Sequence, residues 1–244
     1  MLRIKRTTNP VFRKTLIRPL SFLVLVTSTF LSLAPSATAE KSFRAIFHKA
    51  PAGSPEKLYA HVLEHGVYPI KLPRRSFSSS IELPDGDLVV RISEKETLPP
   101  ETPLEETVNL KIPSGMKSFL MFTYPNPDQQ GPGVAIQLEE TSKVRPGEMM
   151  WINTTTFTVG GSVGDETVVV RPGDIKFVGA PADRGDSSYK LKLDFMAKGS
   201  NKQQRLYSGT WPYDSNSRLI AFVTAGASAS APQINVIKDH VSKE

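Results

Sequence analysis

The sequence predicts an all-β protein of the β-sandwich type, built as two tandem units. Candidate strands recur about every eight to fifteen residues, with turn residues between them, as an all-β fold requires. One strand alternates strictly: Tyr189, Leu191, Leu193 and Phe195 are separated by charged residues and therefore share one buried face. No segment of about ten or more residues shows a helical period. These observations favour strands throughout the chain.

The expected strands are short segments rich in apolar, aromatic and β-branched residues. Residues 119–122 and 219–223 are apolar on both faces, which indicates central strands. Proline stands before Asp-Gly or Gly at 84–86, 146–147 and 172–173, a combination suited to tight turns. The expected strands are 42–47, 57–63, 68–72, 77–83, 87–92, 108–112, 118–124, 134–138, 149–153, 167–170, 174–178, 189–195, 205–211, 218–224 and 234–238.

One stretch departs from the strand pattern. Residues 93–107 are acidic and proline-rich without an apolar period, which is typical of a linker or a long loop. The predicted organisation is a sandwich unit at 40–100, a Pro/Glu-rich linker at 101–107 and a second unit at 108–244, with one large sandwich as the alternative. A faint internal repeat favours two units: 83–91 and 171–178 both contain a turn ending in Gly-Asp that leads into a strand.

Residues 1–39 have the three parts of a secretory signal peptide. Six basic residues and no acidic residue lie in the first twenty positions, and an apolar run follows at 21–34. The small-residue triplet 37–39 then predicts cleavage after Ala39. The apolar run has fourteen residues, whereas a membrane-spanning helix needs about 20. The sequence therefore predicts export to the periplasm or the medium, with no membrane span in the mature chain.

Charge and cysteine content narrow the classes of function. The chain has 30 basic and 24 acidic residues, and the leader holds six of the basic ones, so residues 40–244 carry 24 of each sign. Nucleic-acid binding relies on a surplus of basic side chains, and the balanced mature chain argues against it. The chain has no cysteine, so burial in a core must stabilise the exported protein without disulfides.

Several strand and turn patterns carry a resemblance to a known family. They lie at 43–51, 57–61, 81–86, 147–153 and 168–173, and they combine a strand, a short proline-containing loop, a second strand and a Leu-Pro-x-Gly turn. In these the chain resembles a family of exported bacterial proteins of unknown function with tandem immunoglobulin-like β-sandwich repeats. The resemblance implies an immunoglobulin-like sandwich in the cell envelope or outside the cell. It supplies no catalytic residue, and the Cys-Trp-Cys framework of classical immunoglobulin domains is absent.

Candidate catalytic and metal-binding residues are few. His61 and His65 have the spacing of a helical zinc site, but they fall at the end of an expected strand and in the following loop. With His48 they are the candidate ligands of a metal-dependent hydrolase, the third hypothesis for function. No Gly-x-Ser-x-Gly nucleophile motif is present. The sequence therefore predicts a protein that is not an enzyme and needs no cofactor.

Trp211 and Tyr213 are the candidate binding residues. They flank Pro212 at the end of an expected hairpin, where aromatic rings can form a platform for a ligand. Two functions stay open ahead of the hydrolase. The preferred one is a structural or interaction role in the cell envelope or medium. The alternative is carbohydrate or ligand binding through Trp211 and Tyr213, and the expected partner is accordingly a protein or a glycan of the envelope.

Overall fold

The computed structural model describes residues 41–128, 131–182, 187–226, 228 and 230–240. The expected leader at 1–39 and its cleavage site after Ala39 lie outside the described residues. Within them the fold is all-β, and its helical elements are two short 3-10 turns, η1 (Leu104–Glu106) and η2 (Thr141–Lys143). No helix in this part of the chain is long and apolar enough to span a bilayer. The predicted fold class is confirmed.

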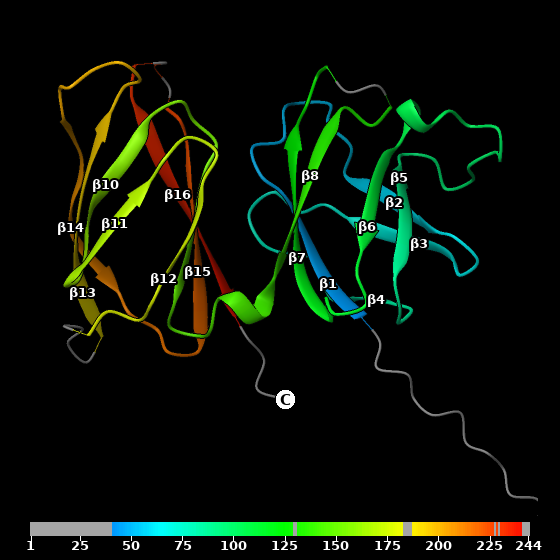
Figure 1. Cartoon of the computed structure of the whole chain (residues 1–244), viewed down its shortest axis with the longest axis horizontal. Coiled ribbons are helices and arrows are strands. Elements are labelled where there is room, and N and C mark those ends of the chain that lie inside the picture. The colour runs from blue at the N-terminus through cyan, green and yellow to red at the C-terminus, as the bar shows by residue number, and fades with distance from the viewer. Residues whose placement is uncertain (1–40, 129–130, 183–186, 227, 229, 241–244) are drawn as a thin grey trace, which may run out of the picture. The chain divides into compact units, whose positions relative to one another are not determined.

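The first sandwich contains strands β1 to β8 (Figure 1). One of its sheets has the order β4-β1-β7-β8, and the other has the order β3-β2-β5-β6. The strands are β1 (Lys41–Phe47), β2 (Lys57–Val62), β3 (Gly66–Lys71), β4 (Ile81–Leu83), β5 (Leu88–Ser93), β6 (Val108–Ile112), β7 (Ser118–Pro125) and β8 (Val134–Glu140).

The second sandwich contains strands β9 to β16 (Figure 1). Its sheets have the orders β12-β9-β15-β16 and β11-β10-β13-β14. The strands are β9 (Met149–Asn153), β10 (Thr158–Val163), β11 (Glu166–Val170), β12 (Ile175–Val178), β13 (Ser188–Met196), β14 (Gln204–Pro212), β15 (Ser217–Ala225) and β16 (Pro232–His240).

The two sandwiches share one topology. Adding eight to each strand number of the first sandwich gives the sheet orders of the second, so β1 corresponds to β9 and β8 to β16. The one parallel pairing of each sandwich is repeated as well: β1 runs parallel to β7, and β9 runs parallel to β15. The predicted two units are therefore confirmed, as two copies of a single eight-stranded plan.

The boundary between the two copies differs from the predicted one. Strand β6, which follows the expected linker at 101–107, pairs with β5, and β7 pairs with β1. Residues 108–140 therefore complete the first sandwich, and 101–107 form a loop inside it. The composition correctly indicated a break between strands, but a loop and a linker have the same composition. The connection between the copies is the short segment 141–148, which contains η2.

Strand β10 has no counterpart among the expected strands. Its sequence, Thr-Val-Gly-Gly-Ser-Val, contains two adjacent glycines, which strands generally disfavour. The packing explains one of them, because a Cβ atom on Gly161 would lie 1.9 Å from the backbone oxygen of Lys192 on β13. Close approach of two backbones thus outweighs strand propensity at this position.

Three apolar clusters contain nearly all of the buried apolar residues. One fills the first sandwich, one fills the second, and the third joins residues of both copies. Alternation divides the central strands between them: on β7, Phe119 and Met121 belong to the first core, whereas Leu120 and Phe122 belong to the third cluster. Strand β15 is divided in the same way. The segments that are apolar on both faces are therefore strands with a core on each side.

Candidate functional site

The candidate functional site is an apolar groove on the outer face of the β3-β2-β5-β6 sheet. Three exposed aliphatic side chains line it: Leu63 is 71% exposed, Val89 51% and Val67 44%. Val67 belongs to β3 and Val89 to β5, and Leu63 directly follows β2. The groove has a volume of about 380 Å³. Exposed aliphatic side chains gathered in one hollow are unusual on a solvated surface and are typical of interaction sites.

The strand register explains why these side chains face outward. His61 lies opposite Val67 on β3 and opposite Arg91 on β5, so the three residues share one face. Val62, which follows His61 on β2, points into the first core, and so does Val90, which precedes Arg91 on β5. Because successive residues alternate between faces, Val89 lies on the same outer face as Arg91.

The acidic, proline-rich stretch 93–107 forms one wall of the groove. Arg91 holds this loop to the sheet: its Nη2 donates to the backbone oxygen of Thr102 at 2.7 Å, and its Nε donates to the hydroxyl of Thr107 at 3.4 Å. The imidazole Nε2 of His61 lies 2.9 Å from the backbone oxygen of Lys95. The loop thereby places Leu98, Pro99 and Pro100 in the lining of the groove.

The second sandwich provides an internal comparison for this surface. On the corresponding outer face, Ser162 of β10 lies opposite Thr167 of β11 and Lys192 of β13. Polar side chains of this kind are typical of a solvated sheet face. The exposed large apolar residues on this face of the second sandwich are Val169 and Met196. The same face of the same fold is thus a lined groove in one copy and largely polar in the other.

Trp211 and Tyr213, the candidate binding residues of the sequence, are both partly buried and pack against the second core. The indole of Trp211 stacks on the buried ring of Trp151, with centroids 5.9 Å apart and planes 7° apart. One face of Trp211 is therefore occupied by the protein itself. The structure does not bring Trp211 together with the groove, which lies on the other sandwich.

Replacing Trp211 with alanine is expected to lower the free energy of unfolding by about 2 kcal/mol. The loss of a stacked, half-buried aromatic ring costs less than the about 3–5 kcal/mol of a fully buried one. Urea denaturation followed by circular dichroism measures the change. An unaltered midpoint would contradict the packing role of Trp211 and favour its use as a contact residue.

The three candidate metal ligands lie at different places in the first sandwich. His48 is buried directly after β1, His61 lies in the groove, and His65 is exposed in the turn between β2 and β3. Among the described residues no group of three or more His, Cys, Asp or Glu side chains is placed to hold a metal ion.

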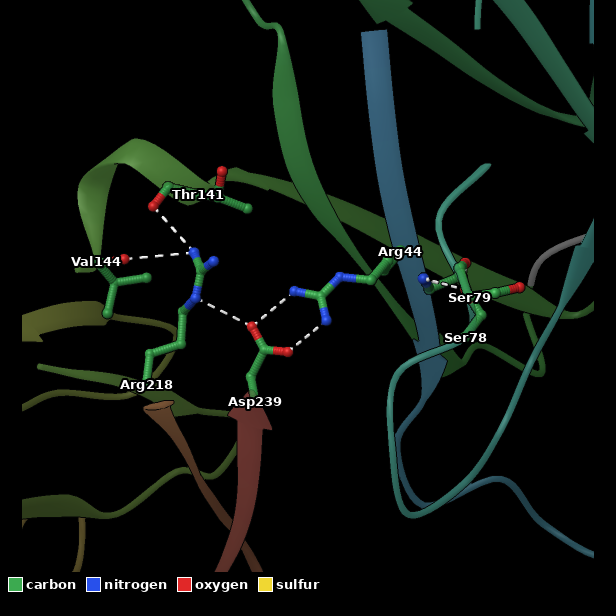
Figure 2. Close-up of polar contacts among 8 residues, drawn as sticks. Arg44, Ser78, Ser79, Thr141, Val144, Arg218 and Asp239 are labelled. Carbon is green, nitrogen blue, oxygen red and sulfur yellow. Dashed lines mark hydrogen bonds and ion pairs between the residues drawn. The ribbon is translucent and has the colours of Figure 1, made fainter. Parts of the chain in front are cut away.

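A buried ionic network joins the two copies of the fold (Figure 2). The carboxylate of Asp239 on β16 is 2% exposed, and Arg44 on β1 binds it with both terminal nitrogens, at 2.6 and 2.8 Å. The Nε of Arg218 on β15 lies 3.0 Å from the same carboxylate. Arg218 also donates from Nη1 to the backbone oxygens of Thr141 and Val144, at 3.1 and 3.3 Å. The carboxylate thus links β1 and β15 to β16, and Arg218 also holds the connecting segment 141–148.

Burial lowers the pKa of Arg218, Asp239 opposes that effect, and the charge of Arg44 adds to it. Two guanidinium groups share one carboxylate in this network, which therefore carries a formal positive charge. The positions of the three charged residues in the sequence give no signal for it, because Arg44 and Asp239 are 195 residues apart.

His48 is held as a neutral imidazole beside this junction. It is 6% exposed, and its ring stacks on Phe222 of β15 with centroids 3.9 Å apart. Burial, with a smaller contribution from the charge of Lys49, lowers the pKa of His48 to about 4. The contact joins the first copy of the fold to the second.

Acidification from about pH 6.5 to about pH 4 is expected to destabilise the protein through His48. In this window the unfolded chain binds a proton on the imidazole and the folded protein does not, so lower pH favours unfolding. The contribution of His48 is complete above the unfolded pKa and is lost as the pH falls through about 4, a change of about 3 kcal/mol. Urea denaturation at several pH values tests it against His48→Phe, which keeps a ring on Phe222. If the unaltered protein and His48→Phe lost the same stability on acidification, His48 would not be its cause.

Comparison with known proteins gives no functional assignment. No family model matches the chain, and no characterised protein matches its sequence. The resemblance to tandem immunoglobulin-like exported proteins stays a prediction. The groove residues escaped sequence reasoning because Val89 lies within the apolar run 88–90, which by itself indicates a buried strand.

Proposed function

We propose that the protein is a non-enzymatic interaction protein of the cell envelope or medium, and that the groove on its first sandwich binds a protein partner. The observation that carries the proposal is the contrast between the two copies: the outer face of β3-β2-β5-β6 is an aliphatic groove, whereas its counterpart is largely polar. The sequence-based prediction of a signal peptide supports the location.

The chemistry of the lining favours a polypeptide over a sugar. Leu63, Val67 and Val89 present aliphatic surface, and the lining contains no Phe, Tyr or Trp ring on which a sugar could stack. Aliphatic side chains of a partner would gain about 25 cal/mol for each Å² of apolar surface that they remove from water. His61, Glu64 and Arg91 lie in the same lining and offer polar groups to the partner's backbone.

The partner is expected to lie on the face of the sheet and not to extend it as an additional strand. Strand β3 is the edge strand that borders the groove, and Pro69 within it has no backbone N–H to donate to a new strand. The binding energy must then come from side chains that enter the groove, with a few residues providing most of it.

Charge introduced into the groove is expected to weaken peptide binding. On an array of short peptides, the protein should prefer those with aliphatic side chains over polar ones of equal length, and Val67→Lys should weaken that binding at least about tenfold. Stability should change by no more than about 0.5 kcal/mol, because Val67 is exposed.

Val169→Lys is the matched control. Val169 belongs to β11, the counterpart of β3, and is 44% exposed, as Val67 is. It should leave peptide binding unchanged. Equal losses from both variants, or no preference for aliphatic peptides, would rule the groove out as the binding site.

A further inference from the structure

A second hollow, which the proposed function does not use, lies where β16 meets two loops of the first sandwich. His48, Lys49 and Ala50 come from the loop after β1, and Arg74 and Arg75 come from the loop after β3. Residues 234–237 of β16 form the opposite wall. The hollow has a volume of about 530 Å³. We call it the basic pocket.

The charge of the basic pocket is of one sign. Lys49, Arg74 and Arg75 bring three positive groups, and no acidic residue is among the residues that line it. Arg74 and Arg75 are exposed, and neither has an ion pair with an acidic side chain of the described residues. Since residues 40–244 carry as many acidic as basic residues, this local excess is not a consequence of the overall composition.

Lys49 is fixed by a hydrogen bond, and His48 lies buried among the residues that line the pocket. The Nζ of Lys49 donates to the backbone oxygen of Ala225 at 2.6 Å, which holds this charge at the junction. The ring of His48 is stacked on Phe222, and the residue is only 6% exposed. Its Nε2 nevertheless has no hydrogen-bond partner in the described part of the chain. A buried polar atom without a partner is unfavourable, which marks His48 as an unusual wall residue.

We propose that the basic pocket binds a small organic anion, a molecule with a phosphate or carboxylate group on an apolar body. The oxyanion is bound by the guanidinium groups of Arg74 and Arg75, which match its planar or tetrahedral oxygens in bidentate geometry. The apolar body packs against β16, where Val236 is 41% exposed and Ile237 is buried in the wall. The imidazole of His48 lies buried among the residues that line the pocket, beside the bound anion.

The size of the pocket separates this ligand from other anions. A volume of about 530 Å³ falls within the roughly 300–1,000 Å³ of small-molecule sites, and a bare inorganic ion would leave the apolar wall uncovered. Nucleic acid is disfavoured because its binding needs an extended basic surface, whereas the positive groups here are confined to two short loops.

Isothermal titration calorimetry at low salt with the full protein tests the proposal, using phenyl phosphate, benzoate, inorganic phosphate and neutral benzamide as probes. Phenyl phosphate or benzoate should bind, more tightly than inorganic phosphate, and benzamide should not. Whichever of the two aromatic anions binds more tightly identifies the head group as phosphate or carboxylate. The affinity should fall as salt rises, because the attraction is screened. Binding of benzamide equal to that of the anions, or no binding of any anion, would overturn the proposal.

A pair of variants locates the site. The double variant Arg74→Gln/Arg75→Gln should weaken binding of the aromatic anion at least about tenfold, because both guanidinium groups are lost. Arg171→Gln, which alters an exposed arginine outside the pocket, should leave it unchanged. In nuclear magnetic resonance spectra the imidazole signals of His48 should shift on saturation with the anion and not with benzamide. Binding that survives the double variant, or that leaves the His48 signals in place, would refute this location.

Discussion

Asp239→Ala is expected to lower the free energy of unfolding by about 3–5 kcal/mol. The substitution leaves Arg44 and Arg218 close together without the carboxylate that both contact. The side chain of Arg218 is 8% exposed, so its charge cannot be solvated in the folded protein. Removing one partner of a buried ion pair typically costs this amount, because the remaining charge stays buried and unpaired.

The measurement is urea denaturation of the unaltered protein and of Asp239→Ala at neutral pH, with Arg205→Gln as the control. Arg205 also pairs with a carboxylate, that of Asp194, but its side chain is 56% exposed. Loss of such a surface pair should cost about 0–1 kcal/mol. If the two variants lost equal stability, the Asp239 network would not be the buried joint between the copies.

Trp151→Ala is expected to cost about 3–5 kcal/mol as well. Trp151 is fully buried in the second core, and its ring stacks on Trp211. Truncation removes the largest fully buried side chain of the described residues and leaves a cavity that the stacked ring can fill only in part. Calorimetric or urea unfolding of the variant gives the change directly.

Trp151→Phe is the matched control, since it keeps an aromatic ring against Trp211 and should cost clearly less than the alanine variant. A small effect of Trp151→Ala would mean that this part of the second core is not closely packed around the indole. The alternation on β9 that places Met149 and Trp151 in one core and Met150 and Ile152 in the other would then be wrong.

Strand positions were predictable from the sequence because they depend on local alternation. Residues 189–195 alternate strictly and form most of β13, and the four apolar residues of this segment all point into the second core. The double-faced segments at 119–122 and 219–223 were predicted as central strands. The second face of each strand is buried in the third cluster by contacts between the copies. A local sequence pattern does not indicate such contacts.

The two-unit organisation was predicted correctly, but the similarity of two turns on which it was based does not reflect the repeat. The turn at 84–87 leads from β4 to β5, whereas the turn at 171–174 leads from β11 to β12. These are not corresponding connections, since β4 corresponds to β12. The similarity of the two turns reflects the general use of Pro, Gly and Asp in reversals. The true equivalence lies in strand order, which only long-range pairing reveals.

The candidate sites were the least predictable part. Aromatic side chains near a hairpin suggested Trp211 and Tyr213, but both pack against the second core. The groove depends on which side of β5 carries Val89, and the basic pocket depends on two loops of the first copy meeting β16 of the second. Register and contacts between distant segments decide both features.

Site-specific photo-crosslinking tests the central claim, that the groove of the first sandwich is the interaction surface. A benzophenone amino acid replaces Val67 in one variant and Val169 in the other, and each protein is irradiated in the cells that produce it. The expected result is a protease-sensitive adduct with another polypeptide from position 67 and none from position 169. Equal adducts from both positions, an adduct with a glycan, or no adduct from position 67 would contradict the claim.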